Sequence, residues 1–124
     1  MGRKVVVIDD DEWSGSAIGD VLADAGWDVQ LMADGRSGLE ALQAIDGGPC
    51  VALIDLMLPD LSGWDIVERL RRDPRTASIP VVTTSAAIIE DPPPDTIFVR
   101  KPFSIADLLA AVNAAWKGSE AARP

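Results

Sequence analysis

The chain has 124 residues, of which 48% are hydrophobic, enough for one compact domain with a two-sided core. Its net charge of -9 disfavours non-specific binding to nucleic acid or to an anionic membrane surface, so we expect neither to be a partner of this domain. It contains no histidine, which excludes a phosphohistidine carrier, a histidine general base and a histidine-ligated zinc site, so any phosphorus chemistry must rest on carboxylates.

Short β-branched runs alternate along the chain with segments of helical periodicity. In chain order the sequence predicts a strand at residues 4–8, a helix at 14–25, a strand at 28–32, a helix at 36–45, a strand at 50–54, a helix at 64–72, strands at 80–84 and 96–99, and a helix from the N-cap Ser104 to Trp116. Continuous apolar strands are typical of a sheet buried on both faces. Because parallel neighbours require crossovers, this order predicts an α/β fold with a doubly wound, five-stranded parallel sheet.

The connection between the last two strands departs from this pattern. Residues 86–95 include the run Pro92, Pro93, Pro94, and ten residues lie at the lower limit for a crossover that contains a helix. We therefore expect the fourth helix of the alternation to be shortened or missing, with at most one turn at 86–89 followed by an extended proline segment.

The sequence as a whole predicts a single cytoplasmic domain at residues 1–117. No apolar run approaches the roughly 20 residues that cross a bilayer, and the first one ends in three aspartates at 9–11, unlike a signal peptide. The single cysteine, Cys50, cannot form an internal disulfide. Residues 118–124 are small and polar, which predicts a flexible tail or the start of a linker.

Residues with chemical potential follow the predicted strands. Asp9 and Asp10 end the first strand, Asp55 the third and Ser85 the fourth, and Lys101 follows the fifth. In an open parallel sheet these carboxyl ends meet at one edge, where crowded carboxylates require a cation and Mg2+ is the ion that oxygen ligands favour. One carboxylate could then attack phosphorus while the lysine holds its oxygens, and the hydroxyl would respond to the bound phosphoryl group.

Four motifs in this order carry a resemblance to a known family: Val-Ile-Asp9-Asp10, the loop Asp55-Leu-Met-Leu-Pro-Asp-Leu-Ser-Gly63, Ile79-Pro-Val-Val-Thr-Thr-Ser85-Ala, and Lys101-Pro-Phe103. Each motif alone is a weak signal, but their order and spacing are specific together. The chain resembles, over nearly its whole length, the response-regulator receiver family of two-component signalling, which includes the chemotaxis receivers. The resemblance fits either a stand-alone receiver or one that belongs to a larger regulator or hybrid kinase.

The resemblance implies a flavodoxin-like fold with strand order 2-1-3-4-5 and a Mg2+ site. It implies that Asp55 accepts a phosphoryl group from a histidine kinase or a histidine phosphotransfer protein. Asp10, Asp55 and the backbone carbonyl of Met57 would ligate the metal, and Asp9 would contribute through water. Such a domain is a signalling switch that catalyses only its own phosphorylation and dephosphorylation, so we do not expect an enzyme.

The resemblance also implies how the switch operates. Ser85 and Lys101 would bind the phosphoryl group, the peptide bond between Lys101 and Pro102 would be cis, and Phe98 would occupy the position of the family's aromatic rotamer switch. A buried core aromatic would look identical to such a switch in the sequence, so both readings of Phe98 stay open. In the family, the positions two residues beyond the acceptor and two beyond the hydroxyl flank the reaction path. Here they are Met57 and Ala87, and neither can orient water, which predicts slow loss of the phosphoryl group.

Other readings remain for several positions and for the function. Asp11 and Glu12 fit a charged first helical turn better than metal ligands, and Trp13 is expected to pack at the rim of the acid cluster. With a mobile proline loop at residues 86–95, we hypothesise that the domain signals by ordering this loop or through a different surface.

The alternative function is a phosphorylation-independent interaction domain of the same fold. A Mg2+-dependent phosphatase would require a second acid where Met57 stands, and a nucleotide-binding domain would require a glycine-rich turn after the first strand. The sequence does not identify the cognate kinase or the downstream partner.

Overall fold

The computed structural model describes residues 3–45 and 49–121. Its elements follow one another as β1 (Arg3–Ile8), α1 (Glu12–Asp24), β2 (Trp27–Met32), α2 (Gly35–Gln43), β3 (Cys50–Asp55), α3 (Gly63–Arg72), β4 (Val81–Ser85), β5 (Ile97–Arg100) and α4 (Ile105–Ala121). The five predicted strands and four predicted helices are all present, with ends that differ by a few residues.

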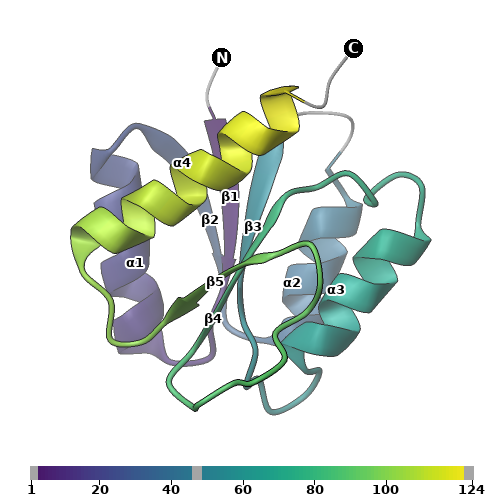
Figure 1. The fold of residues 1–124 in the computed structure, drawn as a ribbon, viewed down its shortest axis with the longest axis horizontal. Coiled ribbons are helices and arrows are strands. Elements are labelled where there is room, and N and C mark those ends of the chain that lie inside the picture. Colours follow the sequence, from purple (N-terminus) through teal and green to yellow (C-terminus); the bar gives the residue numbers. More distant parts are fainter. Residues whose placement is uncertain (1–2, 46–48, 122–124) are drawn as a thin grey trace.

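The strands form one parallel sheet in the order β2-β1-β3-β4-β5, as predicted. Figure 1 shows the sheet between two helical layers, with α1 and α4 on one side and α2 and α3 on the other. Because neighbouring strands are parallel, each crossover returns the chain to the same end of the sheet. With helices on both faces, this is the doubly wound arrangement.

Side chains of the central strands alternate between two apolar cores. Val6, Ile8 and Ile54 pack toward α2 and α3, whereas Val5 and Val7 pack toward α1 and α4. All six residues of β3 are buried. Burying both faces explains why these strands appear in the sequence as unbroken apolar runs.

Short polar side chains cap the helices. Asp11 accepts hydrogen bonds from the amides of Trp13 and Ser14, so it caps α1, in agreement with the interpretation of Asp11 as part of the helix start. The hydroxyl of Ser104 accepts from the amide of Asp107 at the start of α4, as predicted.

The connection between β4 and β5 contains bends and turns but no helix, so the fourth element of helical type along the chain is the one after β5. The connection is nevertheless docked on α3. The indole Nε1 of Trp64 donates to the carbonyl of Asp91 at 3.1 Å, and the guanidinium of Arg71 donates to the carbonyl of Asp95 at 3.3 Å. Pro93 is buried, and its carbonyl accepts from the hydroxyl of Thr96 at 2.7 Å. These contacts with α3 were not predicted.

The predicted end of the domain at residue 117 falls inside α4, so the boundary between the domain and a linker stays a prediction. Helix α4 continues to Ala121, because one glycine inside a helix costs only about 1 kcal/mol and good helix formers follow it. The remainder of the predicted tail, residues 122–124, lies outside the described residues. Among the residues that are described, no helix has the length and apolar character needed to cross a membrane.

Two helical glycines provide a matched test of the packing. A Cβ at Gly38 in α2 would lie 2.5 Å from Cγ1 of Ile8, whereas a Cβ at Gly19 in α1 would lie 3.6 Å from Cγ1 of Val29, which is ordinary contact. We expect Gly38→Ala to lower the free energy of unfolding by about 1–3 kcal/mol, because β1 or α2 must shift. Gly19→Ala should raise it by up to about 1 kcal/mol through helix propensity. Urea unfolding measures both, and equal or greater stability of Gly38→Ala would contradict the close approach of α2 to β1.

Candidate functional site

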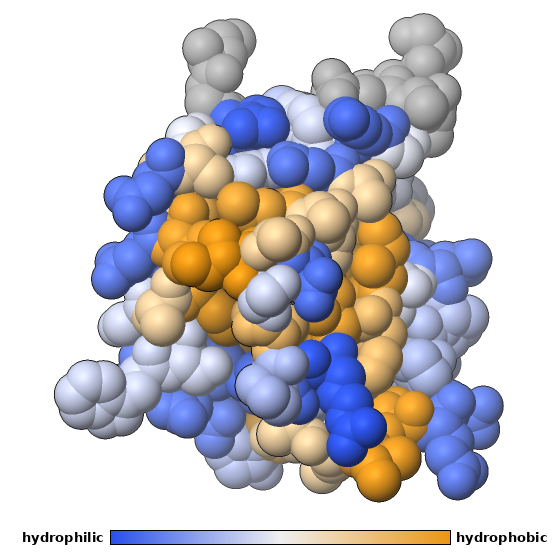
Figure 2. Space-filling model, turned by 60° about the vertical axis from the view of Figure 1, so that its left-hand side comes forward, coloured by the Kyte–Doolittle hydropathy of each residue, from blue (hydrophilic) through white to orange (hydrophobic). Residues whose placement is uncertain are grey.

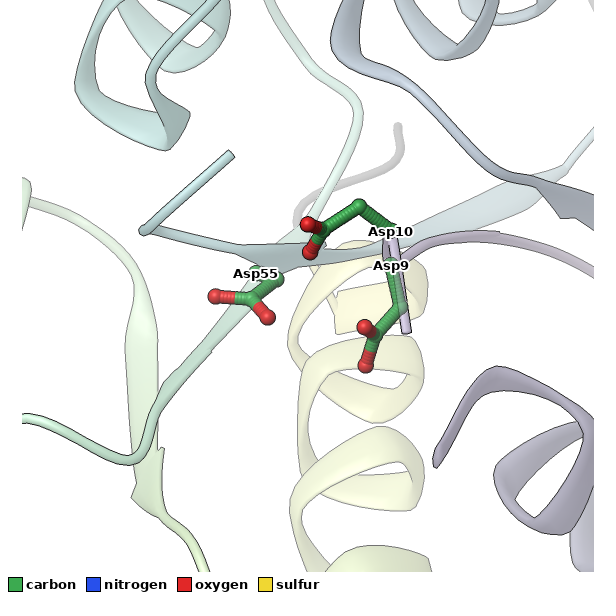
Figure 3. Close-up of side chains that lie close together, drawn as sticks. All are labelled: Asp9, Asp10 and Asp55. Atoms are coloured by element: carbon green, nitrogen blue, oxygen red, sulfur yellow. The ribbon is translucent and has the colours of Figure 1, made fainter. Parts of the chain in front are cut away.

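Three carboxylates converge at the end of β1 and β3. Asp9 and Asp10 directly follow β1, and Asp55 is the last residue of its neighbour β3. Each offers one oxygen to a group in which all these atoms lie within 4.8 Å of one another (Figure 3). Asp9 and Asp55 are buried, with only 3% and 8% of their surface exposed, while Asp10 is exposed. The site thus has two acids seated in the protein and one open to solvent.

Lys101 reaches this group from beyond β5. Its Nζ lies 2.8 Å from Oδ2 of Asp9 and 3.2 Å from Oδ2 of Asp55. Burial lowers the pKa of Lys101, but hydrogen bonds and attraction from the two aspartates outweigh this effect, so its pKa lies above the ordinary value. The ammonium group therefore stays charged and is held between the two acids.

One ammonium does not neutralise three carboxylates, so the site keeps an excess of negative charge. All donor atoms in the group are carboxylate oxygens, which suit a hard divalent cation such as Mg2+ far better than a soft metal. The exposed side of Asp10 leaves room for an ion that retains several waters. The residues present therefore fit a Mg2+ site.

Backbone amides orient the two buried carboxylates. The amide of Asp11 donates to Oδ1 of Asp9 at 2.9 Å, and the amide of Met57 donates to Oδ1 of Asp55 at 2.9 Å. Met57 is 57% exposed, and its amide makes the contact with Asp55. The role of its carbonyl as a metal ligand stays a prediction.

Ser85 ends β4 next to the acid group. The register pairs Asp55 with Thr84, which puts Ser85 one residue beyond Asp55 on the adjacent strand. Ser85 is fully buried, and its hydroxyl accepts a hydrogen bond of 3.1 Å from the amide of Ala87. Its carbonyl accepts from the amide of Lys101 at 2.9 Å. One residue thus joins the acid site, the lysine and the start of the β4–β5 connection.

Two aromatic residues were singled out in the sequence, Phe98 and Trp13. Phe98 lies on β5 opposite Thr83 and is half-buried, so it is not one of the fully buried core side chains. Its role as a switch stays a prediction. The expectation that Trp13 packs at the rim is wrong, because 89% of its surface is exposed. The cap at Asp11 starts α1 just before Trp13, and the helix turns this indole toward solvent.

The Lys101 to Pro102 peptide bond is cis, as the resemblance implies. The sequence analysis did not predict the contact that Asp60 makes with α2. The carboxylate of Asp60, in the loop after Asp55, accepts from the amides of Gly35 and Arg36. Its partners are 25 and 24 residues away in the chain, so no short-range pattern could have revealed them.

Comparisons with known proteins agree with this geometry. The family described as "Response regulator receiver domain" matches residues 5–113. The DNA-binding dual master transcriptional regulator RpaA of Synechocystis is 38% identical over 117 residues, which cover 90% of this chain and 48% of RpaA. The chain spans about half the length of the curated relatives it matches.

Two solved structures illustrate the shared fold. A CheY-like receiver domain from Methanospirillum hungatei superposes with a TM-score of 0.86 at 18% identity, covering 98% of each chain. The receiver domain of the sensor histidine kinase PA1611 from Pseudomonas aeruginosa superposes with a TM-score of 0.83 at 19% identity, covering 94% of this chain and 99% of that one. That structure has a magnesium ion coordinated in its active site cleft. The sequence motifs, the strand order and the family match together show that this chain belongs to the response regulator receiver domain family.

Proposed function

We propose that this domain accepts a phosphoryl group on Asp55 in a Mg2+-dependent reaction and changes conformation to signal. The observation that carries the proposal is the contact of one ammonium group, Lys101 Nζ, with both Asp9 and Asp55 at the end of the sheet. A lysine in this position can follow negative charge from a carboxylate to a phosphoryl oxygen.

Asp9, Asp10, Asp55 and the backbone carbonyl of Met57 are the groups we expect to hold the metal, Asp9 through water. A bound Mg2+ would supply positive charge that offsets the repulsion between the acids and the phosphoryl oxygens. The chain's own residues do the rest. Asp55 is fixed by the amide of Met57, so one carboxylate oxygen forms the bond to phosphorus while the bond from phosphorus to the donor's histidine nitrogen breaks.

The proposed phosphoryl donor is a histidine kinase or a histidine phosphotransfer protein, and the proposed setting is the cytoplasm. RpaA is a DNA-binding regulator, whereas the net charge of -9 leads us to propose that this domain does not itself contact nucleic acid. The domain would act as a switch whose only chemistry is its own phosphorylation and dephosphorylation.

Phosphorylation of Asp55 has a direct test. Incubation with acetyl phosphate and Mg2+ should add the mass of one phosphoryl group to the intact chain, and Asp55→Asn should abolish the addition because an amide is a poor nucleophile. Asp28→Asn is the matched control, since Asp28 is an exposed residue of β2. An unmodified wild-type chain under these conditions would favour the alternative, a phosphorylation-independent interaction domain.

Slow loss of the phosphoryl group is a second expectation. Met57 lies beside the acceptor and cannot orient a water molecule, so the modified chain should persist for minutes or longer. Met57→Asn places an amide there and should shorten the lifetime, whereas Met57→Leu should leave it unchanged. Intact mass measured over time after removal of acetyl phosphate follows all three proteins. Loss within seconds in the wild type would contradict this explanation.

Ser85 is the proposed link from the phosphoryl group to the surface. If its hydroxyl turns to donate to a phosphoryl oxygen, the lone pair that now accepts from the amide of Ala87 leaves that position. The connection from 86 to 96 would then rearrange against α3, where Trp64 and Arg71 hold it. We propose this connection as the part of the domain that signals.

Hydrogen exchange tests the proposed link. Phosphorylation should raise the exchange rate of the Ala87 amide by about tenfold or more, because this amide loses the Ser85 hydroxyl as its acceptor, and rearrangement of the connection should change exchange at other amides of residues 86–95. The same treatment of Asp55→Asn should leave them unchanged. Trp64→Phe, which removes the indole donor to Asp91, should already raise exchange in this segment without phosphorylation. Identical exchange in the phosphorylated and unmodified wild type would rule out this route.

A further inference from the structure

The first turn of α2 is capped by two aspartates from different parts of the chain. Asp34 accepts from the amide of Ser37 at 2.7 Å, which is an ordinary N-cap. The carboxylate of Asp60 accepts from the amides of Gly35 at 2.9 Å and Arg36 at 3.0 Å. A helix leaves its first amides without partners inside the helix, and here the two carboxylates share them.

Asp60 belongs to the segment that follows the phosphoryl acceptor. This acceptor loop, residues 56–62, starts directly after Asp55 and ends where α3 begins. The loop is fixed near its start, because the amide of Leu56 donates to the carbonyl of Thr84 at 2.8 Å. The carbonyl of Leu56 in turn accepts from the amide of Gly63 at 3.0 Å, so the two ends of the loop are joined. Between these anchors, the only described carboxylate that leaves the loop to bond another element is that of Asp60.

The loop and α2 also fit together closely. A Cβ at residue 35 would lie 2.7 Å from the carbonyl oxygen of Leu61, so only glycine allows this approach. Leu58 and Leu61 are buried in the core shared with α2 and α3. Met57 thus stands between the buried side chains of Leu56 and Leu58, and the bonds of Asp60 follow after one proline.

The two hydrogen bonds from the amides of Gly35 and Arg36 to Asp60, here called the tether, favour the charged form of this carboxylate. Hydrogen bonds from Gly35 first, and then from Arg36, hold the pKa of Asp60 below its ordinary value. The positive end of the α2 dipole acts in the same direction. The tether is therefore a charge-assisted pair of bonds between two backbone donors and one side chain.

We propose that Asp60 is a positioning residue for the Mg2+ site, acting through the first turn of α2 to hold the acceptor loop, and with it the backbone of Met57, in the geometry that binds the metal. The proposal rests on the proposed function, in which the carbonyl of Met57 is a ligand. Groups outside the first coordination shell that orient a ligand commonly affect metal affinity by 10-fold or more. Asp60 takes this role without touching the ion.

Asp34 offers a matched control. Asp60→Ala and Asp34→Ala each remove a carboxylate cap from the same helix turn, but only Asp60→Ala detaches the acceptor loop. Isothermal titration calorimetry with MgCl2 on the whole chain should show about tenfold weaker binding for Asp60→Ala and an unchanged dissociation constant for Asp34→Ala. Thermal unfolding without Mg2+ should show a similar loss of stability, about 4 °C or less in Tm, for the two variants.

Phosphorylation supplies a second measurement. With acetyl phosphate at low Mg2+, Asp60→Ala should be modified several-fold more slowly than wild type, and saturating Mg2+ should restore most of the rate. Asp60→Asn, which keeps one acceptor oxygen, should fall between the two and covers the case in which Asp60→Ala does not fold. Mg2+ should also shift the NMR amide signals of Gly35 and Arg36 in wild type, and this Mg2+-dependent shift should be lost in Asp60→Ala.

The outcomes separate the two proposals. Equal Mg2+ affinity in wild type and Asp60→Ala, or equal weakening in Asp60→Ala and Asp34→Ala, overturns the positioning role while wild-type phosphorylation still supports the proposed function. If wild type binds no Mg2+ and takes up no phosphoryl group, the proposed function itself fails. The positioning role is established if Mg2+ binds more weakly only in the Asp60 variants and if saturating Mg2+ restores their rate of phosphorylation.

Discussion

Mutual repulsion of carboxylates at the end of a parallel sheet is the constraint on which the rest of this domain depends. Strand order makes β1 and β3 neighbours, so Asp9 and Asp55 cannot move apart without breaking the sheet. Their burial removes the water that would screen them. Lys101 relieves part of the repulsion, and the negative charge that remains supports the proposed binding of a cation and then of a phosphoryl group.

This constraint requires a rigid support, which the two cores provide. The central strands carry apolar side chains on both faces, so sliding or twisting β3 would open cavities in both layers at once. Functional residues are therefore the first residues after rigid strands, or the last residues within them. The acceptor loop is held by its Asp60 carboxylate, which accepts from backbone amides of α2, and the β4–β5 connection is held by the indole of Trp64. These are the segments that we propose respond to charge at the site.

Sequence reasoning succeeded where the signal is local or where chain order determines proximity. Apolar runs predicted the strands, and the rule that parallel strands end at one edge brought Asp9, Asp10, Asp55 and Lys101 together without any contact being known. The cap at Asp11 follows from a short polar residue before a helical segment. These inferences use spacing along the chain, and spacing is what a sequence states directly.

The failures concern contacts set by the path of a loop. Nothing near Asp60 in the sequence indicates that its carboxylate bonds the start of α2, and nothing near Trp64 indicates a bond to Asp91. The exposure of Trp13 depends on where α1 begins, a boundary that periodicity places only to within a few residues. The small residues after Lys117 suggested a tail because composition does not reveal that α4 already supports the next turn.

The β4–β5 connection shows how a segment without a helix can dock on its neighbour α3. An amphipathic helix would contact α3 through apolar side chains, but here α3 reaches out with the donors of Trp64 and Arg71 to backbone carbonyls of the connection. Arg71 also donates to the carbonyls of Ala77 and Ile79, which lie just before β4. One guanidinium therefore bonds both the segment that leads into β4 and the segment that leads into β5. Apolar packing tolerates small displacements, whereas hydrogen bonds to fixed carbonyls weaken steeply with misalignment. A shift that begins at Ser85 would therefore break individual hydrogen bonds between the connection and α3. A partner that binds both elements would then contact one changed surface.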